Sequence, residues 1–248
     1  MTLRKYKVVL AYDGTRYSGW QFQDNALGIQ QVVEDVLEYL EGGKVRVFGS
    51  SRTDAGVHAK GFVAHFSLTK PIPPKNLVRA MNSRLPEDVR VMRAAYAKED
   101  FDARLSAKGK EYRYHLYQAP IMPPHLAPFW TYYHRSLDIE AMAKAAEYFV
   151  GRHDFVSFAA NPHRDLESTV RNVFSFTVKK NGPRFVFTVR GDGFLYKQVR
   201  SMVGFLIAVG KGNERPEAVK ELLEAKTPRT ARVETAPSRG LFLWKGFY

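Results

Sequence analysis

The order of apolar patterns along the chain constrains its fold more than any other feature. In the first part of the chain, alternating and helical spacings predict strand, helix, strand, strand, helix and strand, and the second part repeats this order. Such an order indicates two split βαβ halves of the ferredoxin or RRM-like kind, each with an open and mainly antiparallel sheet. The predicted fold class is therefore α+β, with one half at residues 1–104 and the other at residues 105–248.

The individual elements follow from the same patterns. The first half is predicted to hold strands at residues 4–12, 45–48, 62–68 and 89–96, with helices at residues 29–40 and 74–85. The second half is predicted to hold strands at residues 110–117, 170–179, 184–190 and 241–247, with helices at residues 139–149 and 195–209.

A charged loop between two predicted strands is the first candidate for chemistry. Its residues 52–60 read RTDAGVHAK, so Asp54 lies two positions from Arg52. A guanidinium there can offset the cost of holding a carboxylate in a partly dry pocket, where Asp54 could act as nucleophile or base. The alternative is structural, because Asp54 could close a turn ahead of Gly56 while Arg52 forms an exposed ion pair of little energetic weight.

Two further candidates lie in the second half. On the strand at residues 110–117, Tyr112 and Tyr114 point to one face, where a tyrosine could stack on an unpaired RNA base or pack within the core. On the helix at residues 195–209, Arg200 adjoins an apolar stripe. This arginine needs an acidic or phosphate partner unless its side chain reaches solvent.

The charge of the chain indicates a polyanionic partner. Lys and Arg number 38 and Asp and Glu number 25, which gives a formal charge of +13. Nucleic acid is the leading candidate, and an anionic membrane surface is the competitor. The longest apolar run, residues 202–209, is too short to span a bilayer, so no membrane insertion is expected. The remaining alternative is that the excess of Lys and Arg serves solubility.

The absence of cysteine from the sequence excludes disulfides, thiolate nucleophiles and Cys-ligated zinc. The seven histidines show no short spacing typical of metal ligands, so no metal site is predicted. The basic N-terminus leads into a strand without an apolar signal core, and a cytoplasmic location is therefore expected. Two irregular stretches, residues 119–136 and 161–168, are rich in Pro, His, Arg and aromatic residues, which is typical of loops that contact a ligand.

Five motifs along the chain together resemble the tRNA pseudouridine synthase A family. They are YDGTRYSGWQ at residues 12–21, RTDAGVH at 52–58, KEYRY at 110–114, FLYKQVR at 194–200 and APSRGL at 236–241. The resemblance implies the pseudouridine synthase fold, with two halves joined around a central basic cleft. It also implies isomerisation of uridine to pseudouridine at positions 38, 39 and 40 in the anticodon arm of tRNA, without cofactor or metal, by a homodimer.

The resemblance also implies a role for five residues. Asp54 would be the catalytic carboxylate, and Arg200 would pair with it and keep it ionised. Tyr112 would stack on the target base, and Leu241 would contact the uracil ring. Arg52 would occupy the space of the flipped base. Leu243 is a near neighbour of Leu241 on the same strand face.

Two positions depart from the family pattern. Ser50 and Ser51 stand where the family commonly has a small residue and glycine, and serine would be strained there if the backbone needed a positive φ. Lys197 stands where histidine or another polar residue is common.

Two rival functions use the same residues. A non-catalytic RNA-binding module would need only basic sheets with aromatic side chains. A nucleoside or glycoside hydrolase would use Asp54 as nucleophile, but it usually needs a second carboxylate, and the loop at residues 52–60 carries none.

Overall fold

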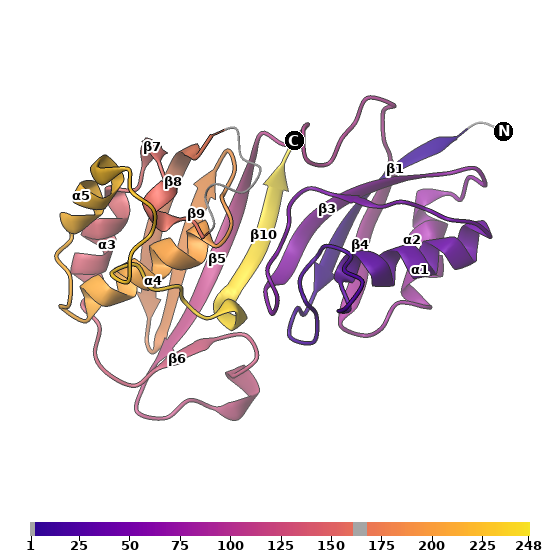
Figure 1. Cartoon of the computed structure of the whole chain (residues 1–248). Helices are drawn as coiled ribbons and strands as arrows, with labels where there is room; N and C mark the ends of the chain where they lie inside the picture. The colour runs from indigo at the N-terminus through magenta and orange to yellow at the C-terminus, as the bar shows by residue number, and fades with distance from the viewer. Residues whose placement is uncertain (1–2, 161–167) are drawn as a thin grey trace. The chain divides into compact units, whose positions relative to one another are not determined.

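The computed structural model describes residues 3–160 and 168–248, and the chain divides into two compact units (Figure 1). One unit contains Met1–Lys108 together with Phe242–Tyr248, and the other contains Gly109–Leu241. The expected division lies at residue 104 and leaves residues 242–248 with the second half. Seven of the eight residues in the expected ligand loop at 161–168 lie outside the described residues.

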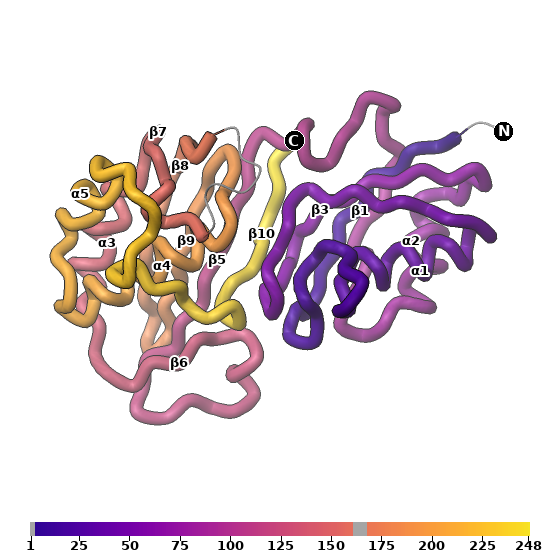
Figure 2. Tube along the Cα trace, in the orientation of Figure 1, coloured from indigo at the N-terminus to yellow at the C-terminus, as the bar shows by residue number. Residues whose placement is uncertain are grey.

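The first unit is a sheet with two helices. Its elements are β1 (Arg4–Tyr12), α1 (Ile29–Glu41), β2 (Phe48–Gly49), β3 (His58–Leu68), α2 (Pro74–Asn82), β4 (Val89–Tyr96) and β10 (Leu241–Phe247), whose first residue belongs to the second unit. Strand β1 pairs antiparallel with both β3 and β4. The other edge of β3 is shared, because β2 pairs antiparallel near its end and β10 pairs parallel at its start. Figure 2 shows β10 running beside β3.

Alternation on the strands of the first unit creates one buried face. Every second residue of β1 is buried, including Tyr6, Val8 and Leu10. Helix α1 contributes Ile29 and Val33 to the core because its apolar residues recur at helical spacing. The helix ends at Gly42, whose φ of 78° is the left-handed conformation that glycine adopts without a steric cost.

The second unit is also built on an antiparallel sheet. Its elements are β5 (Gly109–Gln118), β6 (Thr131–Tyr133), α3 (Ile139–Glu147), β7 (Gly151–Asp154), β8 (Val170–Asn181), β9 (Arg184–Gly191), α4 (Gln198–Gly210) and α5 (Ala218–Ala225), with short 3-10 helices at Pro124–Leu126, Val156–Phe158 and Ser238–Gly240. The strands lie in the order β5, β9, β8 and β7, and β6 pairs parallel with β5. Helix α3 packs on β8 and on α4.

Aromatic side chains fill the core of the second unit. Phe149 packs against Phe155, Phe158 and Phe176, and Phe158 meets Phe205 of α4 at 5.9 Å between ring centroids. The apolar run noted in the sequence lies in this buried helix α4. Within the described part of the chain, no helix has both the length and the apolar character that crossing a membrane requires.

The predicted α+β class and the mainly antiparallel sheets are confirmed. Several boundaries were wrong. The strand expected at residues 45–48 is only β2 at Phe48–Gly49, and β3 begins at His58 rather than at Phe62. Strands β6 and β7 and helix α5 were not predicted.

Candidate active site

The loop that carries Asp54 connects β2 to β3 and ends in a tight turn. The backbone N–H of Val57 donates to the Asp54 carbonyl oxygen at 3.1 Å, and Gly56 within the turn has a φ of 73°. Thr53 is buried, Asp54 is half-buried and Arg52 is exposed. Main-chain atoms therefore contribute a closing hydrogen bond to this turn.

The segment after β1 holds this loop by direct hydrogen bonds. The N–H of Trp20 donates to the Thr53 carbonyl at 3.1 Å, and the N–H of Gly56 donates to the Tyr17 carbonyl at 3.2 Å. The hydroxyls of Tyr12 and Thr53 share a buried hydrogen bond of 2.9 Å. Asp54 therefore lies between two anchored neighbours, and residues 12–21 act as the support for residues 52–57.

Two glycines in this supporting segment allow the close approach. A Cβ on Gly19 would lie 2.3 Å from the Thr53 carbonyl oxygen, and the φ of Gly19 is 94°. A Cβ on Gly14 would lie 2.0 Å from the Val57 carbonyl oxygen. Real Cβ atoms do not approach backbone atoms so closely, so each glycine is needed where it stands.

The support is fastened in turn to the start of β4. The Tyr17 hydroxyl donates to the Asp88 carboxylate at 2.7 Å, and Arg16 donates to the same carboxylate at 2.6 Å. Burial, together with the hydrogen bond to Asp88, raises the pKa of Tyr17 to about 12. Burial alone would raise the pKa of Asp88, but the hydrogen bonds from Tyr17 and Arg16 outweigh it and lower that pKa. Tyr17 thus stays a neutral hydrogen-bond donor, and its bond to Asp88 holds residues 12–21 in place.

A buried histidine follows the loop directly. His58 is fully buried, its Nδ1 lies 3.0 Å from Asp13 Oδ1 and 3.0 Å from the Gly14 nitrogen, and its ring stacks on Phe242 of β10. His58 therefore joins the end of the Asp54 loop to both the supporting segment and the C-terminal strand. The sequence carried no signal for this role, because these partners are distant along the chain.

Serine at positions 50 and 51 carries no backbone strain. Among residues 3–160 and 168–248, the non-glycine residues with positive φ are Lys197 and Lys226. The Ser50 N–H pairs with the Val63 carbonyl in an ordinary sheet contact at 2.8 Å. Lys197, the other departure from the expected pattern, has a φ of 59° and directly precedes α4.

Tyr112 lies on β5 within the second unit. It is 6% exposed and meets Phe194 edge to face, with 5.3 Å between the ring centroids. Tyr114 lies on the same strand face, where burial raises its pKa and its hydroxyl bonds to Thr131 at 2.6 Å. The predicted alternation of β5 is confirmed on this side, since Tyr112, Tyr114 and Leu116 are all buried.

The opposite face of β5 carries a charged cluster that sequence reasoning missed. Glu111 is 1% exposed, and its two oxygens accept hydrogen bonds from Arg113 at 2.8 Å and from Arg190 at 2.6 Å. Burial would raise the pKa of Glu111, but these two arginines outweigh it and lower the pKa. The pairing with Arg190 of β9 could be found only from the strand register.

Arg200 lies in the first turn of α4 and is half-buried. Its Nε donates to the Ala236 carbonyl at 2.8 Å, and the Ala236 N–H donates to the Arg200 carbonyl at 3.0 Å. Gly204, one turn later in α4, allows the segment around Glu234 to pack against the helix. A Cβ on Gly204 would lie 2.1 Å from the Glu234 carbonyl oxygen. Arg200 therefore fixes the APSRGL motif on α4.

Leu241 follows directly from this motif. It is 5% exposed at the start of β10, and Leu243 is 1% exposed. The preceding Gly240 packs closely on the Tyr114 ring, since a Cβ on Gly240 would lie 2.8 Å from the ring carbon Cζ. Arg200, Tyr114 and Leu241 thus belong to one packed region of the second unit. Arg52 and Asp54 belong to the first unit, so the pairing of Arg200 with Asp54 stays a prediction.

Metal-ligating side chains do not gather in the described part of the chain. Over residues 3–160 and 168–248, no three His, Asp or Glu side chains are placed to hold one metal ion. The groups around the Asp54 loop can supply a carboxylate, hydroxyls and backbone amides. A carboxylate among such groups can act as a nucleophile or as a base.

Comparison with known proteins gives one consistent family. A family model described as tRNA pseudouridine synthase matches residues 8–105 and 145–248. The chain is 42% identical over 247 residues to a protein from an Exiguobacterium species named tRNA pseudouridine synthase A, with 99% of this chain and 98% of the relative covered. A protein of the same name from Exiguobacterium sibiricum is 40% identical, with 99% and 97% covered. The tRNA pseudouridine synthase A 2 of Clostridium perfringens is 39% identical, with 99% and 100% covered.

Proposed function

Because this chain belongs to the tRNA pseudouridine synthase family, we propose that it converts uridine to pseudouridine at positions 38, 39 and 40 of the anticodon arm of tRNA. The enzyme is a tRNA-modifying isomerase. One structural observation supports the choice of Asp54 as its catalytic group: the loop that carries this half-buried carboxylate is anchored on both sides, at Thr53 and at Gly56.

The reaction determines what the site must do. The bond between C1′ and N1 of uridine breaks, the uracil turns, and C5 joins C1′. The hydrogen on C5 leaves as a proton, and N1 takes up a proton, so the product is an isomer of the substrate. The detached base must not escape, so the pocket must close around it. Extruding the target nucleotide from its stack costs a few kcal/mol, which base stacking on an aromatic side chain and contacts to phosphates offset.

We assign roles to five residues. Asp54 acts at C1′ as an ionised carboxylate, and Arg200 pairs with it. Tyr112 stacks on the target base, and Leu241 contacts the uracil ring. Arg52 occupies the space that the flipped base leaves. Attack on C6 of the ring and removal of a sugar proton are alternative routes for the same carboxylate. A rigid loop serves all three routes, because catalysis depends on holding the reacting oxygen in a fixed position.

Tyr112 offers a prediction that separates stacking from core packing. Tyr112→Phe keeps the ring and is expected to retain kcat/KM within about threefold. Tyr112→Ala removes the ring, and loss of one stacked base, worth about 1–3 kcal/mol, is expected to lower kcat/KM by about 5-fold to 150-fold. Both variants are assayed well below their unfolding temperatures. If Tyr112→Ala loses stability but keeps its kcat/KM, the tyrosine is a core residue only.

The substrate assignment is tested by mapping pseudouridine in tRNA. Cells that lack this protein are expected to have uridine at positions 38, 39 and 40, and restoring the gene is expected to return pseudouridine there. Restoration with the Asp54→Asn variant serves as the control and is expected to fail. Unchanged pseudouridine at these positions in the deletion strain would contradict the assignment.

We also propose that the enzyme acts in the cytoplasm as a homodimer. The positive charge of +13 is suited to a polyanion such as tRNA, and the described helices include none that could cross a membrane. The dimer is expected from the family resemblance. Light scattering of the purified protein is expected to give twice the chain mass, and the mass of a single chain at micromolar concentration would contradict it.

A further inference from the structure

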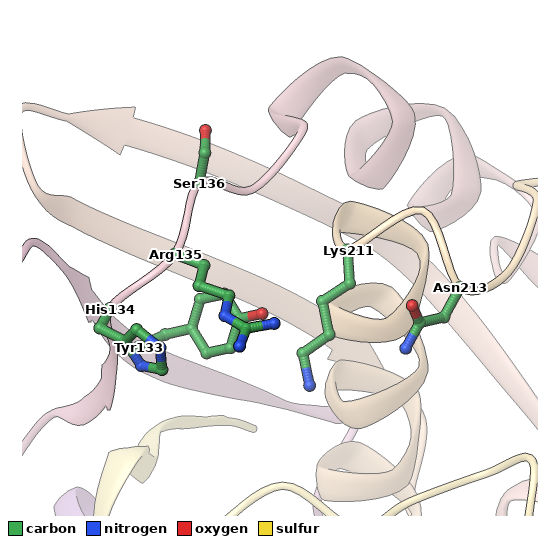
Figure 3. Close-up of a pocket in the computed structure, with 6 residues that line it drawn as sticks. All are labelled: Tyr133, His134, Arg135, Ser136, Lys211 and Asn213. Atoms are coloured by element: carbon green, nitrogen blue, oxygen red, sulfur yellow. The ribbon is translucent and has the colours of Figure 1, made fainter.

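One sequence feature has no role in the proposed reaction. The stretch at residues 119–136 is rich in Pro, His, Arg and aromatic residues, and it connects β5 to α3 by way of β6. Its last residues form one wall of a pocket of about 370 Å³ (Figure 3). The pocket is lined by Tyr133, His134, Arg135, Ser136, Lys211 and Asn213, all within the second unit.

The two walls of this basic pocket are fixed by main-chain contacts. Tyr133 ends β6, which pairs with β5, so its position follows the sheet. Lys211 and Asn213 follow α4, where the Asn213 N–H donates to the Ala208 carbonyl at 3.0 Å. The Asp138 N–H donates to the Gly210 carbonyl at 2.9 Å and links the two walls. The main chain of both walls is therefore held in place by the fold of the second unit.

The lining is cationic and carries no acid. The charged lining residues are Arg135 and Lys211, and both are exposed, as is His134. Figure 3 shows the Arg135 and Lys211 side chains extending into the space between the walls, whereas Ser136 points away. Lys211 Nζ also lies 5.1 Å from the centroid of the Tyr133 ring. The C-terminus of α4 carries a partial negative charge, which favours a cation at the position of Lys211. Arg135 comes from a separate segment and adds a second positive charge to the pocket.

We propose that this basic pocket binds a backbone phosphodiester of the tRNA. The proposal rests on the proposed function, which supplies the RNA. A guanidinium matches phosphate oxygens with two parallel hydrogen bonds, and an ammonium adds a point charge. The Asn213 amide and the Tyr133 hydroxyl are neutral donors that suit the adjoining phosphate and ribose oxygens. The pocket thereby adds affinity for the tRNA through residues that have no assigned role in the reaction.

The test is the salt dependence of tRNA binding by a double variant, Arg135→Ala with Lys211→Ala. Loss of the contact to this phosphate is expected to reduce the slope of log affinity against log salt by about 0.7 to 0.9. The dissociation constant near physiological salt is expected to rise about tenfold, and KM is expected to rise with it. The kcat at saturating tRNA is expected to stay within about twofold.

A matched control removes the same two charges elsewhere in the second unit. Arg152 is exposed on β7, and Lys220 Nζ lies 4.3 Å from the Tyr148 ring, which reproduces the lysine–tyrosine contact of the pocket. The Arg152→Ala and Lys220→Ala double variant is expected to keep the wild-type slope to within about 0.4. Equal slopes in the two double variants would overturn the proposal.

Two further outcomes are decisive. If inorganic phosphate at micromolar concentration binds the wild type but not the pocket variant, while tRNA binds both with the same slope, the site belongs to a small free anion and the proposal is wrong. If the wild type binds tRNA with the expected slope but forms no pseudouridine, the proposed function fails while the pocket result stands. Binding and product are therefore measured on the same preparations.

Discussion

Asp54→Asn is expected to abolish pseudouridine formation while leaving tRNA binding intact. The substitution keeps the shape of the side chain, so the loop anchors at Thr53 and Gly56 are retained. It removes the charged oxygen that the proposed reaction requires, and we expect kcat to fall by at least about 100-fold. Single-turnover product formation and equilibrium tRNA binding measure the two effects separately.

A second Asp→Asn change provides the control for charge. Asp100 is exposed in the same unit, and Asp100→Asn is expected to leave kcat and affinity unchanged. Both variants are expected to keep a free energy of unfolding within about 1 kcal/mol of the wild-type value, because Asp100 is exposed and asparagine keeps the shape of the Asp54 side chain. Turnover by Asp54→Asn at even a tenth of the normal rate would remove Asp54 from the chemistry.

Gly19→Ala is expected to give the second largest loss, although Gly19 has no functional group. A Cβ there would lie 2.3 Å from the Thr53 carbonyl oxygen, next to Asp54, so the loop must move. A displacement of about 1 Å at a reacting group can cost about 100-fold in rate, and we expect kcat to fall by that factor. Affinity for tRNA is expected to change less than about threefold, since the substitution alters no charge.

The control separates this close contact from strain in the backbone. Gly42 also has a positive φ, at 78°, but its nearest neighbour is the flexible end of Lys70 at 3.4 Å. Gly42→Ala is expected to lower the free energy of unfolding by about 1 kcal/mol and to leave kcat unchanged. If Gly19→Ala and Gly42→Ala have equal effects on kcat, the contact with Thr53 is not what positions Asp54.

Local patterns in the sequence were sufficient for the longer elements. Strand β1 alternates over Arg4–Tyr12, and α1 carries apolar residues at helical spacing up to Gly42, so both were predicted close to their bounds. Strands β6 and β7 have three and four residues, which is too few for an alternation to stand out. Helix α5 has eight residues, and its short apolar stripe follows a loop rich in charged residues.

Long-range pairing explains the remaining differences. Strand β3 begins at His58 because Ala59 pairs with Tyr12 of β1 and with Leu243 of β10, and neither partner is near in sequence. The C-terminal residues 242–248 are likewise grouped with the first unit, although they are distant from it in sequence. Glu111 was missed for a similar reason, since its partner Arg190 lies 79 residues away.

The candidate site shows the same limit. Asp54 was identified because a charged loop followed a predicted strand, and the role of Arg52, Tyr112, Arg200 and Leu241 came from the resemblance of motifs. The reason that YDGTRYSGWQ accompanies RTDAGVH was visible only in the structure, where one segment supports the other through Trp20, Gly56 and two close glycine contacts. The structure thus explains why the two motifs occur together, because one motif holds the other in place.

Release of tritium from tRNA labelled at C5 of uridine tests the central claim most directly. Joining C5 to C1′ expels the hydrogen on C5, so the wild type is expected to release tritium into water in an amount equal to the pseudouridine formed, over many turnovers and without free uracil. The Asp54→Asn variant is expected to release none. Tight tRNA binding without any release would identify an RNA-binding module, and free uracil would identify a hydrolase; either result would contradict the isomerase account.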